Sequence, residues 1–97
     1  MIKTFADSGT RDIAAGKNTA AARKALPTDL CLSAQRKMAV IDRARSLKDI
    51  YNIPGYRFEK LTGDRKGHYS IRINKQYRIC FNWDGENAFL VEITDYH

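Results

Sequence analysis

The sequence predicts an α+β fold, a small antiparallel or mixed β-sheet with N-terminal helices packed on one of its faces. Apolar residues recur at three- and four-residue steps before Pro54-Gly55, which is the spacing of a helix face. After Pro54-Gly55 they alternate with polar residues, which is the spacing of a half-buried strand. Helices followed by a run of strands are typical of α+β proteins. A chain of 97 residues can bury one core, so we expect one domain over residues 1–97.

The first 26 residues carry the weakest pattern. Met1–Phe5 alternates weakly and predicts a short strand. Residues 6–26 are rich in Ala, Lys and Thr, and Gly9 and Gly16 interrupt them. Because glycine marks breaks in helical patterns, we expect a short helix around Thr10–Ala15 and then a loop.

The central helix is the clearest element. Pro27 suits a first turn and Asp29 favours the positive end of a helix. The apolar side of this helix consists of Cys31, Ala34, Met38, Ile41 and Ala44. Its other side carries Arg36, Lys37, Arg43 and Arg45, which form either an ordinary solvated face or part of a basic surface.

One further helical turn and four strands complete the predicted fold. Ser46 is the expected cap of the turn Leu47–Asn52. Short connections between the strands leave only antiparallel neighbours. The strands are expected at Arg57–Leu61, His68–Asn74, Tyr77–Asp84 and Ala88–Thr94.

Two arginines are predicted to lie side by side on the sheet. If Ile71 and Ile79 both face the core, Arg72 lies directly opposite Arg78 on the other face. Like charges in that position disfavour the sheet unless an anion or a carboxylate lies between them. The pair therefore indicates a phosphate site, or alternatively two arginines that reach solvent or an acid such as Glu92 or Glu59.

Two further segments carry groups that suit RNA chemistry. The loop Gly63–Gly67 holds Arg65 and Lys66 between two glycines, which fits a tight turn but lacks the P-loop spacing. Asp95-Tyr96-His97 supplies a carboxylate, an aromatic ring for stacking and an imidazole, unless this segment is simply a frayed terminus.

Charge and composition favour a polyanionic partner. The net charge is +6, and all 17 Lys and Arg lie within residues 1–78, whereas residues 79–97 contain four acids and no Lys or Arg. Nucleic acid is one such partner, although solubility alone can also explain the excess. No apolar run has membrane-helix length, so we expect a soluble cytoplasmic chain without a membrane partner. Cys31 and Cys80 have no metal-ligand spacing and are read as reduced thiols, so no metal or other cofactor is expected.

The sequence also resembles a known protein family. The run from Leu61 to Asn74, the segment Gln76–Phe81 and the ending Asp95-Tyr96-His97 resemble the HigB toxins of the RelE/ParE superfamily. Met1–Phe5 and Ala44–Ile50 fit the same pattern, which covers nearly the whole chain and is weakest from Ala6 to Ala25.

The resemblance implies the toxin of a type II toxin-antitoxin system. Such toxins enter the ribosome and cleave the mRNA held there without a metal. The ribose 2′-OH attacks the adjacent phosphate. The implied partner is a HigA-type helix-turn-helix antitoxin that neutralises the toxin and represses their shared promoter DNA, and the implied fold is a RelE/ParE-like domain.

The implied roles follow from the chemistry of that cleavage, which needs a base, cations and an acid. Arg78 is assigned to the phosphate, with Arg72 and Lys60 as supporting cations and the loop cations Arg65 and Lys66 nearby. His97 is the expected general acid. Asp95 is the base or orients His97, and Tyr96 positions the nucleotide.

One departure and two alternatives remain. Several members of the family carry histidine where this chain has Glu59 and lysine where it has Thr62. Glu59 can act as a base, but the smaller number of cations predicts a slow or context-dependent nuclease. The alternatives are a ParE-like DNA gyrase inhibitor without chemistry, and a weakened toxin that mainly modulates operator binding by the antitoxin.

Overall fold

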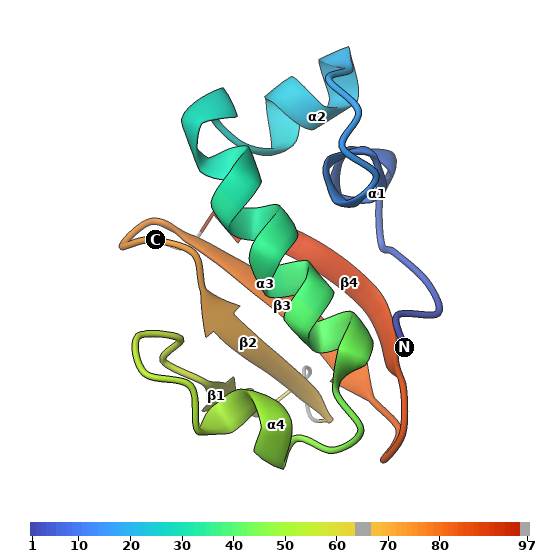
Figure 1. Cartoon of the computed structure of the whole chain (residues 1–97), viewed down its shortest axis with the longest axis vertical. Coiled ribbons are helices and arrows are strands. Elements are labelled where there is room, and N and C mark those ends of the chain that lie inside the picture. Colours follow the sequence, from blue (N-terminus) through green and yellow to red (C-terminus); the bar gives the residue numbers. More distant parts are fainter. Residues whose placement is uncertain (64–66, 96–97) are drawn as a thin grey trace.

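Four antiparallel strands in the order β1-β2-β3-β4 form the sheet of this computed structural model, which describes residues 1–63 and 67–95 (Figure 1). The three longer strands confirm the predicted pattern. The first strand is shorter than predicted because Arg57 has φ 47°, which interrupts an extended backbone. The strands are β1 (Glu59–Lys60), β2 (His68–Arg72), β3 (Tyr77–Trp83) and β4 (Ala88–Asp95).

The register of the two central strands is the predicted one. Ile71 pairs with Ile79, and Arg72 pairs with Arg78. Side chains of successive strand residues point to opposite faces. The isoleucines therefore lie on one face of the sheet and the arginines on the other.

Helices cover the face that carries the isoleucines. In Figure 1, α3 lies across β3, and α1 and α2 lie at the end of the same layer. Among the described residues, no helix is long and apolar enough to cross a membrane. The helices are α1 (Ser8–Ala14), α2 (Ala20–Ala25), the short 3-10 helix η1 (Thr28–Leu30), α3 (Cys31–Arg43) and α4 (Lys48–Tyr51).

Helix α2 occupies a stretch that was expected to be a loop. Thr19 begins it, because its hydroxyl accepts a hydrogen bond from the backbone N–H of Ala22 at 3.1 Å. Gly9, which suggested a break, lies inside α1 instead. A Cβ on Gly9 would lie 2.6 Å from the carbonyl oxygen of Ala21. This glycine therefore permits the close packing of α1 against α2.

The cap expected at Ser46 is also wrong. Helix α4 starts after Leu47, which makes no side-chain capping bond. The Asp49 carboxylate instead accepts from the backbone N–H groups of Arg45 and Ser46, at 2.9 and 3.3 Å. An acidic side chain inside the first turn thus supports this helix start from within.

The N-terminal segment runs parallel to β4 instead of forming a regular strand. Isolated bridges join Ile2 to Ala88 and Phe5 to Val91. The Lys3 N–H donates to the Ala88 carbonyl at 2.8 Å. This segment covers the outer edge of β4 and makes the arrangement mixed at that edge.

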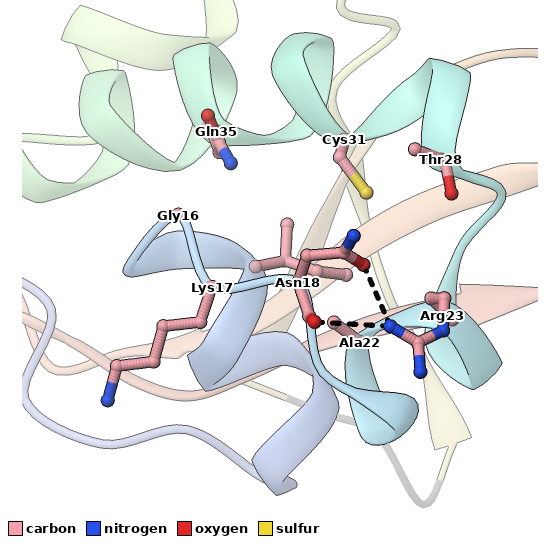
Figure 2. Close-up of a pocket in the computed structure, with 9 residues that line it drawn as sticks. Gly16, Lys17, Asn18, Ala22, Arg23, Thr28, Cys31 and Gln35 are labelled. Atoms are coloured by element: carbon pink, nitrogen blue, oxygen red, sulfur yellow. Dashed lines mark hydrogen bonds between the residues drawn. The ribbon is translucent and has the colours of Figure 1, made fainter.

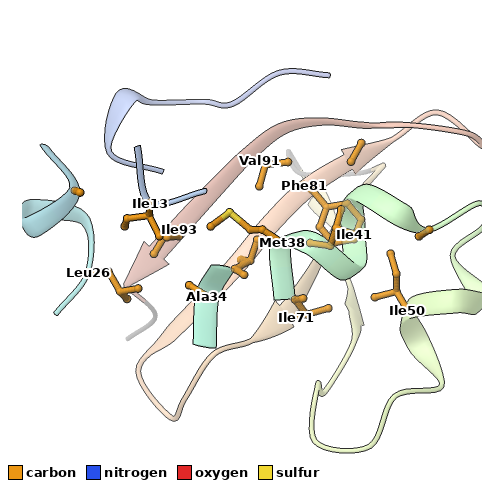
Figure 3. Packing of buried hydrophobic residues seen from close by; sticks show 14 residues of the cluster. Ile13, Leu26, Ala34, Met38, Ile41, Ile50, Ile71, Phe81, Val91 and Ile93 are labelled. Carbon is orange, nitrogen blue, oxygen red and sulfur yellow. The ribbon is translucent and has the colours of Figure 1, made fainter. Parts of the chain in front are cut away.

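The core lies between α3 and the sheet. Ala34, Met38 and Ile41 point from α3 toward Ile71 and Phe81 (Figure 3). These side chains are at most 2% exposed. Burying the larger of these side chains, Met38, Ile41, Ile71 and Phe81, stabilises the fold by roughly 1.5–3 kcal/mol each.

Candidate active site

The face of the sheet opposite the helices carries mostly polar side chains, and we call it the polar face. The strand register places three rows of residues on it, because directly paired residues share a face. From the register, its members are Glu59, His68, Ser70, Arg72, Arg78, Cys80, Asn82, Phe89, Glu92 and Thr94.

Arg78 is the anchored cation of the polar face. It is only 7% exposed. Its Nε donates to Ser70 Oγ at 2.9 Å, and its Nη2 donates to the backbone carbonyl of Arg57 at 2.7 Å. Two neutral oxygen atoms, one on β2 and one in the segment before β1, thus set the plane of the guanidinium. These two hydrogen bonds hold the guanidinium in place.

The conformation of Arg57 explains why its carbonyl reaches the guanidinium. Its φ of 47° lies in the left-handed region, which non-glycine residues adopt at a cost of roughly 1–2 kcal/mol. The peptide just before it is also engaged, because the Tyr56 carbonyl accepts from the Arg72 N–H at 2.6 Å. The segment before β1 therefore follows the edge of β2 and then turns one carbonyl toward Arg78.

Glu59 shares the polar face with the arginine pair. It pairs with Ser70 across β1 and β2 and is exposed. Since the Ser70 hydroxyl also holds Arg78, Glu59 and Arg78 lie on the two strands that flank Ser70. The structure thus brings together Arg72, Arg78 and Glu59 of the predicted set.

Lys60 and Asp95 are not on this face. Lys60 pairs with Tyr69, and Asp95 pairs with Tyr77, so the register directs both toward the helix-covered side of the sheet. Both are exposed. The Asp95 carboxylate oxygens accept from the Gln76 side-chain amide at 3.3 Å. Lys60 and Asp95 therefore do not share a face with Arg72 and Arg78.

Four predicted residues lie outside the described part of the chain: Arg65, Lys66, Tyr96 and His97.

Sequence reasoning missed two partners of Arg78. Ser70 was detectable, since it precedes Arg72 by two positions and therefore shares its face. The carbonyl of Arg57 was not, because no residue type signals a left-handed turn at an arginine. His68 and Asn82, which pair directly, were also overlooked on this face.

Several ionisable groups with displaced pKa values lie elsewhere. Burial lowers the pKa of Lys37, whose ammonium lies 5.4 Å from the centre of the Tyr56 ring. Burial likewise raises the pKa of the Tyr56 phenol. Burial, followed by the Asp29 charge, raises the pKa of the Cys31 thiol. These groups belong to the helical layer and to the segment before β1.

The helical layer also contains a small cavity of about 140 Å³, between α1, α2 and α3 (Figure 2). Ile13, Ala22 and Cys31 line it, and Arg23 lies at its rim. Arg23 Nη1 donates to the carbonyl and the side-chain oxygen of Asn18, both at 3.1 Å. No group of three or more potential metal ligands occurs in residues 1–63 and 67–95.

Solved structures share this fold. Two YoeB-YefM toxin-antitoxin complexes from Staphylococcus aureus each contain a chain that matches with a TM-score of 0.62. The match covers 100% of this chain and 98% of the other, at 18% sequence identity. At that identity the likeness establishes the fold alone.

Curated relatives match part of the chain. "Toxin HigB-1" of Vibrio cholerae serotype O1 is 43% identical over 58 residues, which are 60% of this chain and 61% of that protein. "Endoribonuclease HigB" of Proteus vulgaris is 31% identical over 61 residues, which are 63% of this chain and 65% of that protein. The matched region thus spans somewhat less than two thirds of these relatives.

A family model matches a much longer region. It describes the RelE-like toxin HigB of type II toxin-antitoxin systems, and it matches residues 5–97. That region includes the anchored arginine, its partner strands and the helices that support the sheet. The chain therefore belongs to the HigB-like toxin family.

Proposed function

We propose that this protein is the toxin of a type II toxin-antitoxin system and cleaves mRNA in the ribosome. The observation that carries the proposal is the Arg78 guanidinium, which is fixed on the polar face directly opposite Arg72. Membership of the HigB-like toxin family and the relative named "Endoribonuclease HigB" support it. We place the whole activity in one domain, residues 1–97, acting in the cytoplasm.

The reaction needs no group beyond protein side chains. The ribose 2′-oxygen forms a bond to the adjacent phosphorus while the bond from phosphorus to the 5′-oxygen breaks. A base takes the 2′-OH proton, and an acid gives a proton to the departing 5′-oxygen. The products are a 2′,3′-cyclic phosphate and a 5′-OH.

Arg78 and Arg72 are proposed to stabilise the negative charge that grows on the phosphate. A guanidinium whose position is already fixed loses little freedom when it binds a planar array of oxygens. A phosphate bound beside the two directly opposite arginines is proposed to interact with both positive charges.

Glu59 is the proposed base, because it is the carboxylate of the predicted set that shares the face of Arg78. His97 is the proposed acid and Tyr96 the group that positions the nucleotide, with Arg65 and Lys66 adding positive charge. Asp95, held by Gln76 on the other side, is proposed to orient the chain end, and Lys60 to attract RNA from the edge.

The proposed partners follow from the same family. A HigA-type antitoxin is proposed to neutralise the toxin and to link it to promoter DNA. The ribosome is proposed to supply the mRNA substrate.

The test is to map mRNA 5′ ends after brief induction of the wild type and of the R78A and H97A variants. We expect new 5′-OH ends inside translated reading frames for the wild type, and a loss of at least about 100-fold in the variants. K75A, an exposed cation outside the site, is the matched control and should cleave normally.

Growth arrest without new ends would overturn the nuclease and favour a gyrase inhibitor. Unchanged growth arrest and unchanged mRNA ends in R78A and H97A would remove the catalytic assignment.

A further inference from the structure

We infer that the polar face carries a second subsite, which binds a nucleobase of single-stranded RNA through Phe89, Asn82 and His68. The inference rests on the proposed function and extends it to a nucleotide beyond the one that is cleaved. The three residues form one row across β2, β3 and β4, since His68 pairs with Asn82 and Asn82 pairs with Phe89.

A β-bulge turns Phe89 onto this face. The register of β3 and β4 shifts between Cys80 and Asn82, where one extra residue is inserted into β4. Counting back from Glu92 without that shift, regular alternation would direct Phe89 toward the helices. With the shift, Phe89 pairs with Asn82 on the polar face, and the small Ala88 takes the core position at 0% exposure.

The bulge is maintained at a cost. Leu90 has φ 52°, the left-handed region, and its side chain is 51% exposed. Its N–H donates to Thr4 Oγ1 at 2.8 Å, so the N-terminal segment holds the bulge in place. Bulges that re-aim a side chain are common beside functional sites, and strain of this kind points to a function.

Phe89 also stands apart from the other phenylalanines. The chain has four, and Phe5, Phe58 and Phe81 all belong to the core or pack against it. Phe89 is half-buried and does not belong to that cluster. An aromatic ring on the polar face offers a flat surface on which a base can stack, a contact worth about 1–3 kcal/mol per base.

Asn82 and His68 supply polar groups beside the ring. The Asn82 amide nitrogen lies beside Gly67, 3.8 Å from the place that a Cβ on this glycine would take. An asparagine amide can both donate to and accept from the edge of a base. His68 Nδ1 is buried and has no hydrogen-bond partner among the described residues, so no such bond fixes its ring through that atom.

The spacing from the arginine pair fits a neighbouring nucleotide. His68 and Arg72 are four residues apart on β2, which corresponds to about 13 Å. That separation is too long for the base and the phosphate of one compact nucleotide. The row therefore holds a base of an adjoining nucleotide while Arg78 holds the phosphate that reacts.

The experiment measures binding of a fluorescein-labelled RNA of about 12 nucleotides, 2′-O-methylated to prevent cleavage, free and on ribosomes. F89A should weaken binding roughly 5- to 150-fold. Its dependence on salt should stay that of the wild type, because no phosphate contact is lost. F89W should keep the wild-type affinity. L90N is the matched control, since it removes an exposed apolar side chain while asparagine tolerates the left-handed conformation.

The outcomes separate the subsite from the function on which it rests. R78A should weaken binding and reduce the slope of log K against log salt by about 0.7, unlike F89A. Equal affinity of F89A and wild type, alongside weaker binding by R78A, would overturn the subsite and leave the proposed function standing. If the wild type bound the RNA neither free nor on ribosomes, the subsite and the proposed function would both be overturned. If L90N weakened RNA binding as much as F89A does, the loss would come from a disturbed β4 and not from the Phe89 ring, and the subsite would be overturned.

Discussion

A buried arginine needs acceptors, and Arg78 finds them in a serine hydroxyl and a backbone carbonyl. Ser70 is 1% exposed, so water cannot replace its hydroxyl. Removing an acceptor from a buried charged donor costs more than the bond itself contributes, because the donor stays buried without a partner. Ser70 is thus a positioning residue for the proposed phosphate cation.

A matched pair of variants isolates that hydroxyl. Threonine and valine have the same shape, and only threonine keeps an acceptor for Arg78 Nε. We expect S70V to be less stable than S70T by about 1–3 kcal/mol. Urea denaturation followed by circular dichroism measures the difference. Equal stability of the two variants would show that this hydrogen bond contributes nothing.

The Asp84 carboxylate makes the folding stability of the protein depend on pH. Backbone N–H groups of Asn87 and Glu86 donate to its carboxylate and hold its pKa below the ordinary 3.8. Its stabilising contribution is therefore fully present above pH 3.8 and is lost as the pH falls through the lower folded-state value.

The D84N variant keeps a side-chain oxygen as acceptor but does not titrate. Urea denaturation between about pH 5 and pH 2 should show a steeper loss of stability for wild type than for D84N. Parallel curves would contradict the assignment.

Among the secondary-structure elements, those with a regular alternation of apolar residues were predicted correctly from the sequence. Alternation in β2 and β3 was enough to pair Arg72 with Arg78, because a shift by one residue would turn the isoleucines out of the core. Helix α1 begins at Ser8, before the expected Thr10, because Gly9 is not a break; its missing side chain allows α1 and α2 to touch. Such a packing role depends on a neighbour that local sequence does not reveal.

The candidate site was predictable only where regular strand alternation sets the face on which a residue lies. Arg72, Arg78 and Glu59 share a face, as expected from alternation in their strands. Alternation also directs Lys60 and Asp95 to the other face, which resemblance to a family had obscured. The bulge at Leu90 has no signal in the sequence, because the residue that favours such a conformation is glycine.

The left-handed conformation of Leu90 in this bulge is expected to lower the stability of β4. Glycine adopts φ 52° without steric cost, so L90G should stabilise the protein by up to about 1 kcal/mol. L90A keeps the strain and loses the leucine side chain, so it should gain nothing. Thermal and urea denaturation of both variants decide the point. A less stable L90G would show that the leucine side chain contributes more than the strain costs.

For the whole molecule, α3 and the sheet depend on one shared core. Ile41 is 0% exposed in that core, whereas Leu32 on the same helix is 57% exposed. I41A should lower the free energy of unfolding by about 2–5 kcal/mol, because it leaves a cavity. L32A should change it by less than about 0.5 kcal/mol. Similar losses in both variants, measured by urea denaturation, would contradict this division.

The link between the first residues and β4 has a consequence for biosynthesis. The Thr10 hydroxyl accepts from the Ile93 N–H, and the Thr4 hydroxyl from the Leu90 N–H, so each bond joins residues more than 80 positions apart. Until β4 has been synthesised, Thr4 and Thr10 have no strand to lie against. These native contacts form only after β4 has been made and has left the ribosomal exit tunnel, so the protein completes this edge of the sheet late in folding.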